Sequence, residues 1–192
     1  MKKKLLILLP CIVLLMSGPV FALTIDAYES SNTSAISNWI SNLGGSVEVL
    51  ENFESVGTGW YEQLVLPFGT FTAGGDPGEG ETSYQKNVDS SETSPYFSIR
   101  DSAWYGRGNQ TPGGAKYLDS GDITLLTLEL TASVRNLFFF LQDPSDVRAT
   151  TTVGSEFESV SLFPRLDNGN LWFIGIAADK DLASITWSTT TA

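Results

Sequence analysis

Residues 123–153 read ITLLTLELTASVRNLFFFLQDPSDVRATTTV and contain three successive segments with the composition of β-strands. Residues 123–130 mix β-branched and apolar side chains over the length of a strand, and residues 137–141 are uniformly apolar, with three consecutive Phe. A run this apolar is expected to be buried on both faces. Asp143-Pro144 then predicts a turn before a third, Thr-rich strand, because proline lacks the N–H that strand pairing needs.

Strand-like segments separated by turn residues continue on both sides of this stretch. We expect roughly eight to ten strands at a spacing of about 8–12 residues, which is typical of an antiparallel two-sheet protein. Asn168-Gly169 predicts a hairpin, and residues 179–181 predict a turn between the last two strands. The sequence therefore predicts an all-β fold, an antiparallel two-sheet β-sandwich, formed as a single domain by residues 23–192.

One segment near the N-terminus has a different period. Within residues 30–45, the apolar positions Ile36, Trp39, Ile40 and Leu43 recur at intervals of three and four, as on one face of a helix. Residues 31–34 supply capping side chains, and a Gly-Gly pair supplies the stop. We expect one short helix here, with Trp39 packed into the core rather than presented to a partner.

The first 22 residues, MKKKLLILLPCIVLLMSGPVFA, have the pattern of an export signal. Three lysines precede an apolar segment that is too short to span a membrane, and small side chains precede the expected cleavage site after Ala22. Cys11 lies inside the apolar segment and is expected to leave with it. The sequence thus predicts a signal peptide at residues 1–22 and a secreted or extracellular mature protein without a membrane span.

The charge and the composition exclude several kinds of function. The whole chain has a net charge of −11, and loss of the three leader lysines lowers this by three, to −14. Such an acidic protein is not expected to bind nucleic acid. The chain contains no His, and its one Cys lies in the predicted leader. Disulfides, Cys or His zinc sites, thiol nucleophiles and imidazole-dependent catalysis are therefore not expected in the mature protein.

Four segments resemble a known family of exported proteins. They are YLDSGD at residues 117–122, FFFLQDPSDV at 138–147, WFIGIA at 172–177 and ITWS at 185–188. Together they resemble the β-sandwich ectodomains of PEP-CTERM proteins, which are exported by Gram-negative bacteria that make extracellular polysaccharide. The resemblance implies a jelly-roll-like fold, secretion and association with surface or matrix polysaccharide or with surface proteins, and it brings no catalytic residues.

The sequence departs from the family pattern at its end. Family members usually continue into a Pro-Glu-Pro tag, an apolar span and a basic tail, whereas this sequence stops at Ala192. Either the tag has been lost or the sequence is truncated. The resemblance therefore does not extend to the processing and surface anchoring that depend on the tag.

Two loop-like stretches combine aromatic side chains with hydrogen-bonding groups, as sugar-binding sites do. The alternative role for their tryptophans is to close the open ends of the sandwich. The candidate ligand-binding residues are Trp60, Tyr61, Trp104, Tyr105, Arg107, Asn109 and Gln110.

Two pairs of aspartates flank predicted turns at strand ends, where side-chain and backbone oxygens could hold a structural calcium ion. Aspartate is also common in turns for local reasons, and the regular calcium-loop pattern is absent. The candidate calcium ligands are Asp119, Asp122, Asp143 and Asp146. No other cofactor is expected.

The function expected from the sequence is non-enzymatic. We expect a secreted, cell-surface or extracellular-matrix protein that acts by interaction or structure, with polysaccharide as one candidate partner. The alternative is a carbohydrate-binding module that uses loop aromatics. A carboxylate-based glycoside hydrolase or lyase is a remote third, because no spacing in the sequence identifies the facing pair of carboxylates that it needs.

Overall fold

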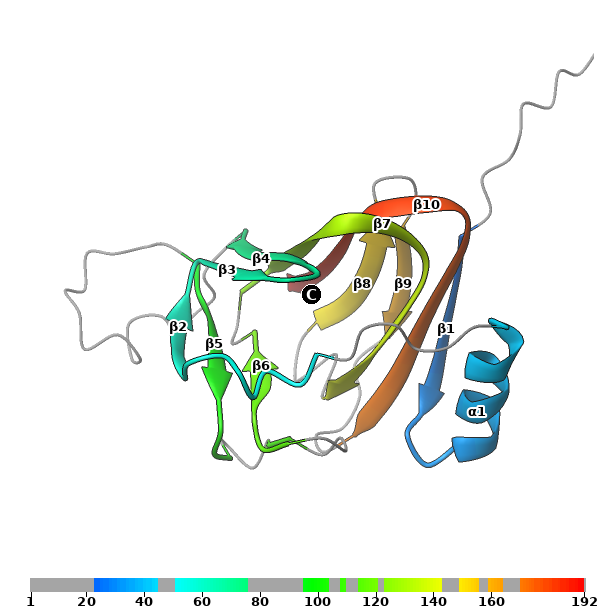
Figure 1. Ribbon diagram of the computed structural model, residues 1–192, viewed down its shortest axis with the longest axis horizontal. Helices are drawn as coiled ribbons and strands as arrows, with labels where there is room; N and C mark the ends of the chain where they lie inside the picture. Colours follow the sequence, from blue (N-terminus) through cyan, green and yellow to red (C-terminus); the bar gives the residue numbers. More distant parts are fainter. Residues whose placement is uncertain are drawn as a thin grey trace, which may run out of the picture.

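The larger part of the fold is antiparallel β-sheet, with one short helix near the N-terminus (Figure 1). This confirms the expected all-β class and its single helix among the described residues. The computed structural model describes residues 23–44, 51–75, 95–103, 108–109, 114–120, 123–142, 149–155, 159–163 and 170–191. The predicted signal peptide, residues 1–22, lies outside these ranges.

The described elements form two sheets. The larger sheet runs in the order β3-β4-β7-β10-β8-β9, with β1 added to β10, and the smaller runs β2-β5-β6. In chain order the elements are β1 (Leu23–Glu29), α1 (Thr33–Asn42), β2 (Gly59–Tyr61), β3 (Gln63–Leu66), β4 (Gly69–Gly74), β5 (Phe97–Arg100), β6 (Tyr117–Asp119), β7 (Leu125–Gln142), β8 (Ala149–Ser155), β9 (Ser159–Phe163) and β10 (Leu171–Thr191).

β7 and β10 pair along almost their whole length and bend together over the molecule (Figure 1). Ala177 pairs with Asn136 before the bend and Ser184 pairs with Glu129 after it. Equal lengths of both strands lie between these pairs, so the two irregularities cancel and the original register returns. At the bend, Arg135 Nε lies 2.8 Å from Asp181 Oδ1, and both side chains are mostly exposed.

The turn predicted at residues 179–181 is therefore wrong. The charged residues Asp179, Lys180 and Asp181 remain within β10, and the chain bends there without reversing. The polar residues 131–136 likewise lie inside β7, not between two strands. Pairing between the two strands resumes at Leu182 with Val134 and at Ser184 with Glu129, and this outweighs the local turn signal in both segments.

The hairpin predicted at Asn168-Gly169 is also wrong, because β9 and β10 are not neighbours. β8 lies between them and pairs with both. The second half of β10 takes β8 as its partner, from Ile185 opposite Ser155 onward. Residues 164–169 themselves lie outside the described ranges.

The bend gives the sheet two hydrophobic clusters. The first packs the β3–β4–β7 end of the large sheet against the small sheet, and the second is formed by side chains of β1, β8, the second half of β7 and both halves of β10. Trp187 contacts both clusters. The buried members of the first are Leu64, Leu66, Phe71, Phe97, Ile99, Ile123, Leu126 and Leu128, and those of the second are Val153, Ile174, Ile176, Leu182 and Ile185.

Helix α1 confirms the prediction for residues 30–45. The Asn32 side chain caps its first turn by accepting a hydrogen bond from the Ala35 N–H, and Gly44 adopts a φ of 66° just after the last turn. Trp39 is buried, as expected, and its indole N–H donates to Asp26 Oδ2 at 2.9 Å.

Trp39 lies across one row of the sheet in which Asp26, Gly175 and Phe138 are direct cross-strand partners. The ring sits over Gly175, where an added Cβ would come within 2.4 Å of indole Cε2. Its edge also meets Phe138, at a centroid distance of 6.3 Å. The absence of a side chain at position 175 is what lets the helix pack this closely on β10.

We expect Gly175→Ala to lower the free energy of unfolding by about 2–3 kcal/mol, because the methyl group must displace a buried ring. Gly57→Ala is the matched control, since a Cβ there meets only the Tyr61 hydroxyl at an ordinary 3.5 Å. Urea denaturation followed by Trp fluorescence measures both. Equal stability of the two variants would contradict the close packing of Trp39.

A group of hydrogen bonds joins residues 51–56 to Ala115 and Lys116, which directly precede strand β6. Glu54 Oε1 accepts hydrogen bonds from the backbone N–H groups of Ala115 and Lys116, each at 2.7 Å. In return, Lys116 Nζ donates to the carbonyl oxygens of Glu54 and Val56. The hydrogen bond from the Lys116 N–H contributes most to holding the pKa of Glu54 below its usual value of 4.5, and the Ala115 N–H and the Lys116 charge add to it.

This lowered pKa predicts a contribution to acid sensitivity. A carboxylate whose pKa is lower in the folded state stabilises the fold above its unfolded pKa, and that stability is lost as the pH falls through the folded pKa. We therefore expect the wild type to lose more stability below pH 4.5 than Glu54→Gln does. Urea melts between pH 7 and pH 3 measure the difference, and parallel curves would exclude a role for Glu54.

Candidate functional site

The face of the small sheet that points away from the core carries polar and charged side chains. Along β5, Phe97 and Ile99 belong to the first hydrophobic cluster, so Ser98 and Arg100 point to the opposite face. Although it points away from the core, Ser98 is only 2% exposed. Strand β5 is therefore covered on both sides, and its second side is polar.

Strand pairing brings further residues to this face. Ser98 is the direct partner of Trp60 on β2 and of Asp119 on β6, and Arg100 is the partner of Tyr117. Direct partners in a sheet share a face. We call this group the polar face; its members are Trp60, Ser98, Arg100, Tyr117 and Asp119.

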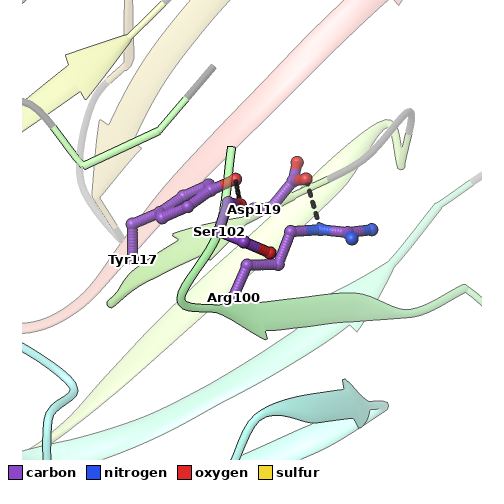
Figure 2. A network of polar contacts seen from close by, with 4 residues as sticks. All are labelled: Arg100, Ser102, Tyr117 and Asp119. Carbon is purple, nitrogen blue, oxygen red and sulfur yellow. Dashed lines mark hydrogen bonds and ion pairs between the residues drawn. The ribbon is translucent and has the colours of Figure 1, made fainter. Parts of the chain in front are cut away.

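An ion pair lies at the centre of the polar face. Arg100 Nε is 2.8 Å from Asp119 Oδ2, and the two side chains are only 15% and 8% exposed. Figure 2 shows the two side chains reaching toward each other from neighbouring strands. Beside them the Tyr117 hydroxyl donates to the carbonyl oxygen of Ser102 at 3.1 Å, which holds the chain just after β5 against β6.

The guanidinium of Arg100 also stacks on an aromatic ring. Arg100 Cζ lies 4.8 Å from the centroid of the Trp60 ring, within the range of a cation–π contact. One cation thus contacts a side chain from each neighbouring strand, Trp60 on β2 and Asp119 on β6. This arrangement fixes the mutual position of all three strands of the small sheet.

The predicted sugar-binding residues are only partly within the described ranges. Trp60 and Tyr61 lie in strand β2 rather than in a loop, so the predicted context for this pair is wrong. Tyr61 is stacked on Phe97 with a centroid distance of 6.0 Å, and its hydroxyl donates to the Gly57 carbonyl. Of this pair, only Trp60 contributes to the polar face.

Asn109 has a local structural contact. Its side-chain amide donates to the carbonyl oxygens of Gly114 and Lys116, at 2.9 and 3.0 Å, and so bridges the entry to β6. The remaining candidates from this stretch lie outside the described residues: Trp104, Tyr105, Arg107 and Gln110.

Among the predicted calcium ligands, only Asp119 is described; Asp122, Asp143 and Asp146 lie outside the described ranges. The Arg100 cation beside Asp119 Oδ2 works against binding a divalent cation at the same oxygen. Within the described residues, no group of three or more Asp, Glu, His or Cys side chains is arranged to hold a metal ion. Calcium binding by the two turns stays a prediction.

No helix in the described part of the chain is long and apolar enough to cross a membrane. Comparisons with the models of known protein families, with characterised proteins and with solved structures returned no match.

The sequence analysis missed Ser98, Arg100 and Tyr117. A usable signal was present, because Phe97 to Arg100 alternates apolar and polar residues, and Asp119 has the same parity as Tyr117 on a second short strand. The missing information was the register that places these two segments side by side.

We expect Arg100→Met and Asp119→Asn each to lower the free energy of unfolding by about 3 kcal/mol, because each leaves a buried group without its charged partner. Ser98→Ala is the control on the same strand, and its effect is expected to stay below about 1 kcal/mol, because within the described chain the Ser98 Oγ has no hydrogen-bond partner. Chemical denaturation of the three variants tests this order. An Arg100→Met protein as stable as Ser98→Ala would contradict it.

Proposed function

We propose that this chain is a non-enzymatic, exported protein of the bacterial cell surface or extracellular matrix that acts by interaction or structure. One observation supports this proposal above the others. The charged and aromatic groups of the polar face contact one another: Arg100 forms an ion pair with Asp119 and stacks on Trp60. A carboxylate paired with a fixed cation in this way is suited to holding strands together. Glycoside hydrolysis instead needs two carboxyl groups facing each other across a cleft.

The finer features of the proposal come from the sequence. A jelly-roll-like course of the strands, cleavage after Ala22 and association with extracellular polysaccharide are implied by the leader pattern and by the resemblance to PEP-CTERM ectodomains. The antiparallel two-sheet fold is compatible with the first of these. The acidic composition favours neutral glycans or cationic surfaces over anionic polymers as partners.

A carbohydrate-binding module is the second candidate, and the position of Trp60 favours it. The ring is partly exposed, and Arg100 fixes it from one side. A ring that is already held in place loses little conformational freedom when a sugar stacks on it. Trp60 is therefore the described residue best placed to contact a glycan.

The experiment is to incubate the mature protein, residues 23–192, with a panel of bacterial and plant polysaccharides. We expect retention of the protein on at least one polysaccharide without release of reducing ends, because the proposed function is binding without turnover. Co-sedimentation measures the binding and a reducing-sugar assay measures the turnover. Release of reducing ends would overturn the non-enzymatic assignment.

Two substitutions at one position separate the two candidates. If Trp60 stacks on sugar, Trp60→Ala should weaken binding about tenfold or more, while Trp60→Phe should retain much of it. Circular dichroism checks that both variants stay folded. Equal binding by the folded Trp60→Ala protein would exclude the stacking model and leave the interaction to another surface.

A further inference from the structure

The second half of β7 forms an edge of the large sheet. Residues 136–142 pair with the first half of β10 on one side. On the other side of β7, strand β4 pairs only with β7 residues 125–130 and does not reach residues 136–142. No strand of the described chain pairs with the outer side of residues 136–142. Backbone groups along such an edge are available for pairing with another strand.

The side chains of this edge are unusually apolar. Alternate residues face the second hydrophobic cluster, and the others face the side of the sheet that α1 covers; Phe140, on that side, is 37% exposed. The expectation that residues 137–141 are buried on both faces therefore fails at Phe140. Natural edge strands are usually protected by charge or proline, and residues 136–142 contain neither.

Phe140 ends a row of aromatic rings that crosses the sheet. Tyr28, Phe173 and Phe140 are successive cross-strand partners on β1, β10 and β7, with centroid distances of 6.3 and 5.7 Å. The row reaches the edge at a ring that is partly exposed. An added strand with an aromatic residue opposite Phe140 would extend the row and cover that ring.

The sequence of the edge is its own antiparallel complement. Leu137-Phe138-Phe139-Phe140-Leu141 reads the same in both directions, and an amide side chain stands at each end, Asn136 and Gln142. When two copies pair antiparallel about a two-fold axis at Phe139, Phe140 faces Phe138 of the second copy, and Leu faces Leu. Each Phe140 then gains a ring on its outer side, in addition to Phe173 on its inner side.

We propose that two copies of this chain associate through the edge formed by residues 136–142, giving a two-fold symmetric dimer in which the large sheet continues from one copy into the other. The interface is isologous, because both copies use the same residues. The strand itself is uncharged, but each copy carries a large negative charge, so added salt should strengthen the association by screening the repulsion. This proposal is independent of the polysaccharide experiment.

The first test measures the oligomeric state of the mature protein by sedimentation velocity over a range of concentrations. We expect a concentration-dependent dimer that Phe140→Lys weakens about tenfold or more, since it places two cations in the interface. Val65→Lys is the matched control: Val65 is 71% exposed and lies on β3, an edge at the far side of the same sheet. A wild type that is monomeric throughout, or equal loss of dimer in both variants, would overturn the proposal.

The second test reads the register and does not depend on the stability of Phe140→Lys. The chain has no Cys after residue 11, so single cysteines report unambiguously. In the proposed register Asn136 faces Gln142 of the second copy, at a separation that a disulfide can span. Under mild oxidation, a mixture of Asn136→Cys and Gln142→Cys proteins should cross-link, whereas either protein alone should not. Cross-linking of the separate proteins, or none in the mixture, would exclude this register.

Discussion

The pairing of β7 with β10 is the constraint on which the rest of the fold depends. Each strand is long enough to contribute side chains to both hydrophobic clusters. The pair bends in the middle, and its original register returns beyond the bend. One half of the pair is extended by β4 and the other by β1, while the second half of β10 also takes β8. Trp187 lies near the junction and contacts both clusters. Insertion or deletion of one residue in one of the two strands would shift the side chains beyond it to the wrong face.

The small sheet is stabilised in a different way. Its strands are short, so backbone hydrogen bonds alone contribute little to its stability. Packing of Phe97 and Ile99 against the first cluster holds one face, and Arg100 connects the three strands on the other through an acid and an indole. A buried ion pair of this kind adds little to the net stability, because the cost of removing two charges from water offsets much of their attraction.

The sequence was sufficient where the structural signal was local. Helix α1 follows directly from the spacing of its apolar residues and its cap. Composition also predicts β-structure within residues 123–153, but it divides β7 into two strands. Residues 179–181 carry a local turn signal, but pairing of β10 with β7, which is distant in sequence, keeps them inside a strand. Asn168-Gly169 predicts a hairpin between β9 and β10, but β9 pairs with the strand before it, β8. The Arg100–Asp119 pair escaped detection for the same reason: nothing near either residue in the sequence indicates that β5 and β6 are neighbours. From the sequence alone, Asp119 indicates only the turn that follows it and a candidate calcium ligand.

The position of β1 in the sheet has a consequence for the order of folding. Leu23 pairs with Ala178 and Glu29 with Trp172, so the first strand of the described chain cannot pair until the last one is present. The Trp39 side chain cannot reach Gly175 before that segment has been synthesised. The first described strand and the helix therefore remain without their native partners until β10 is present. Both segments are then candidates for binding by a chaperone during this interval.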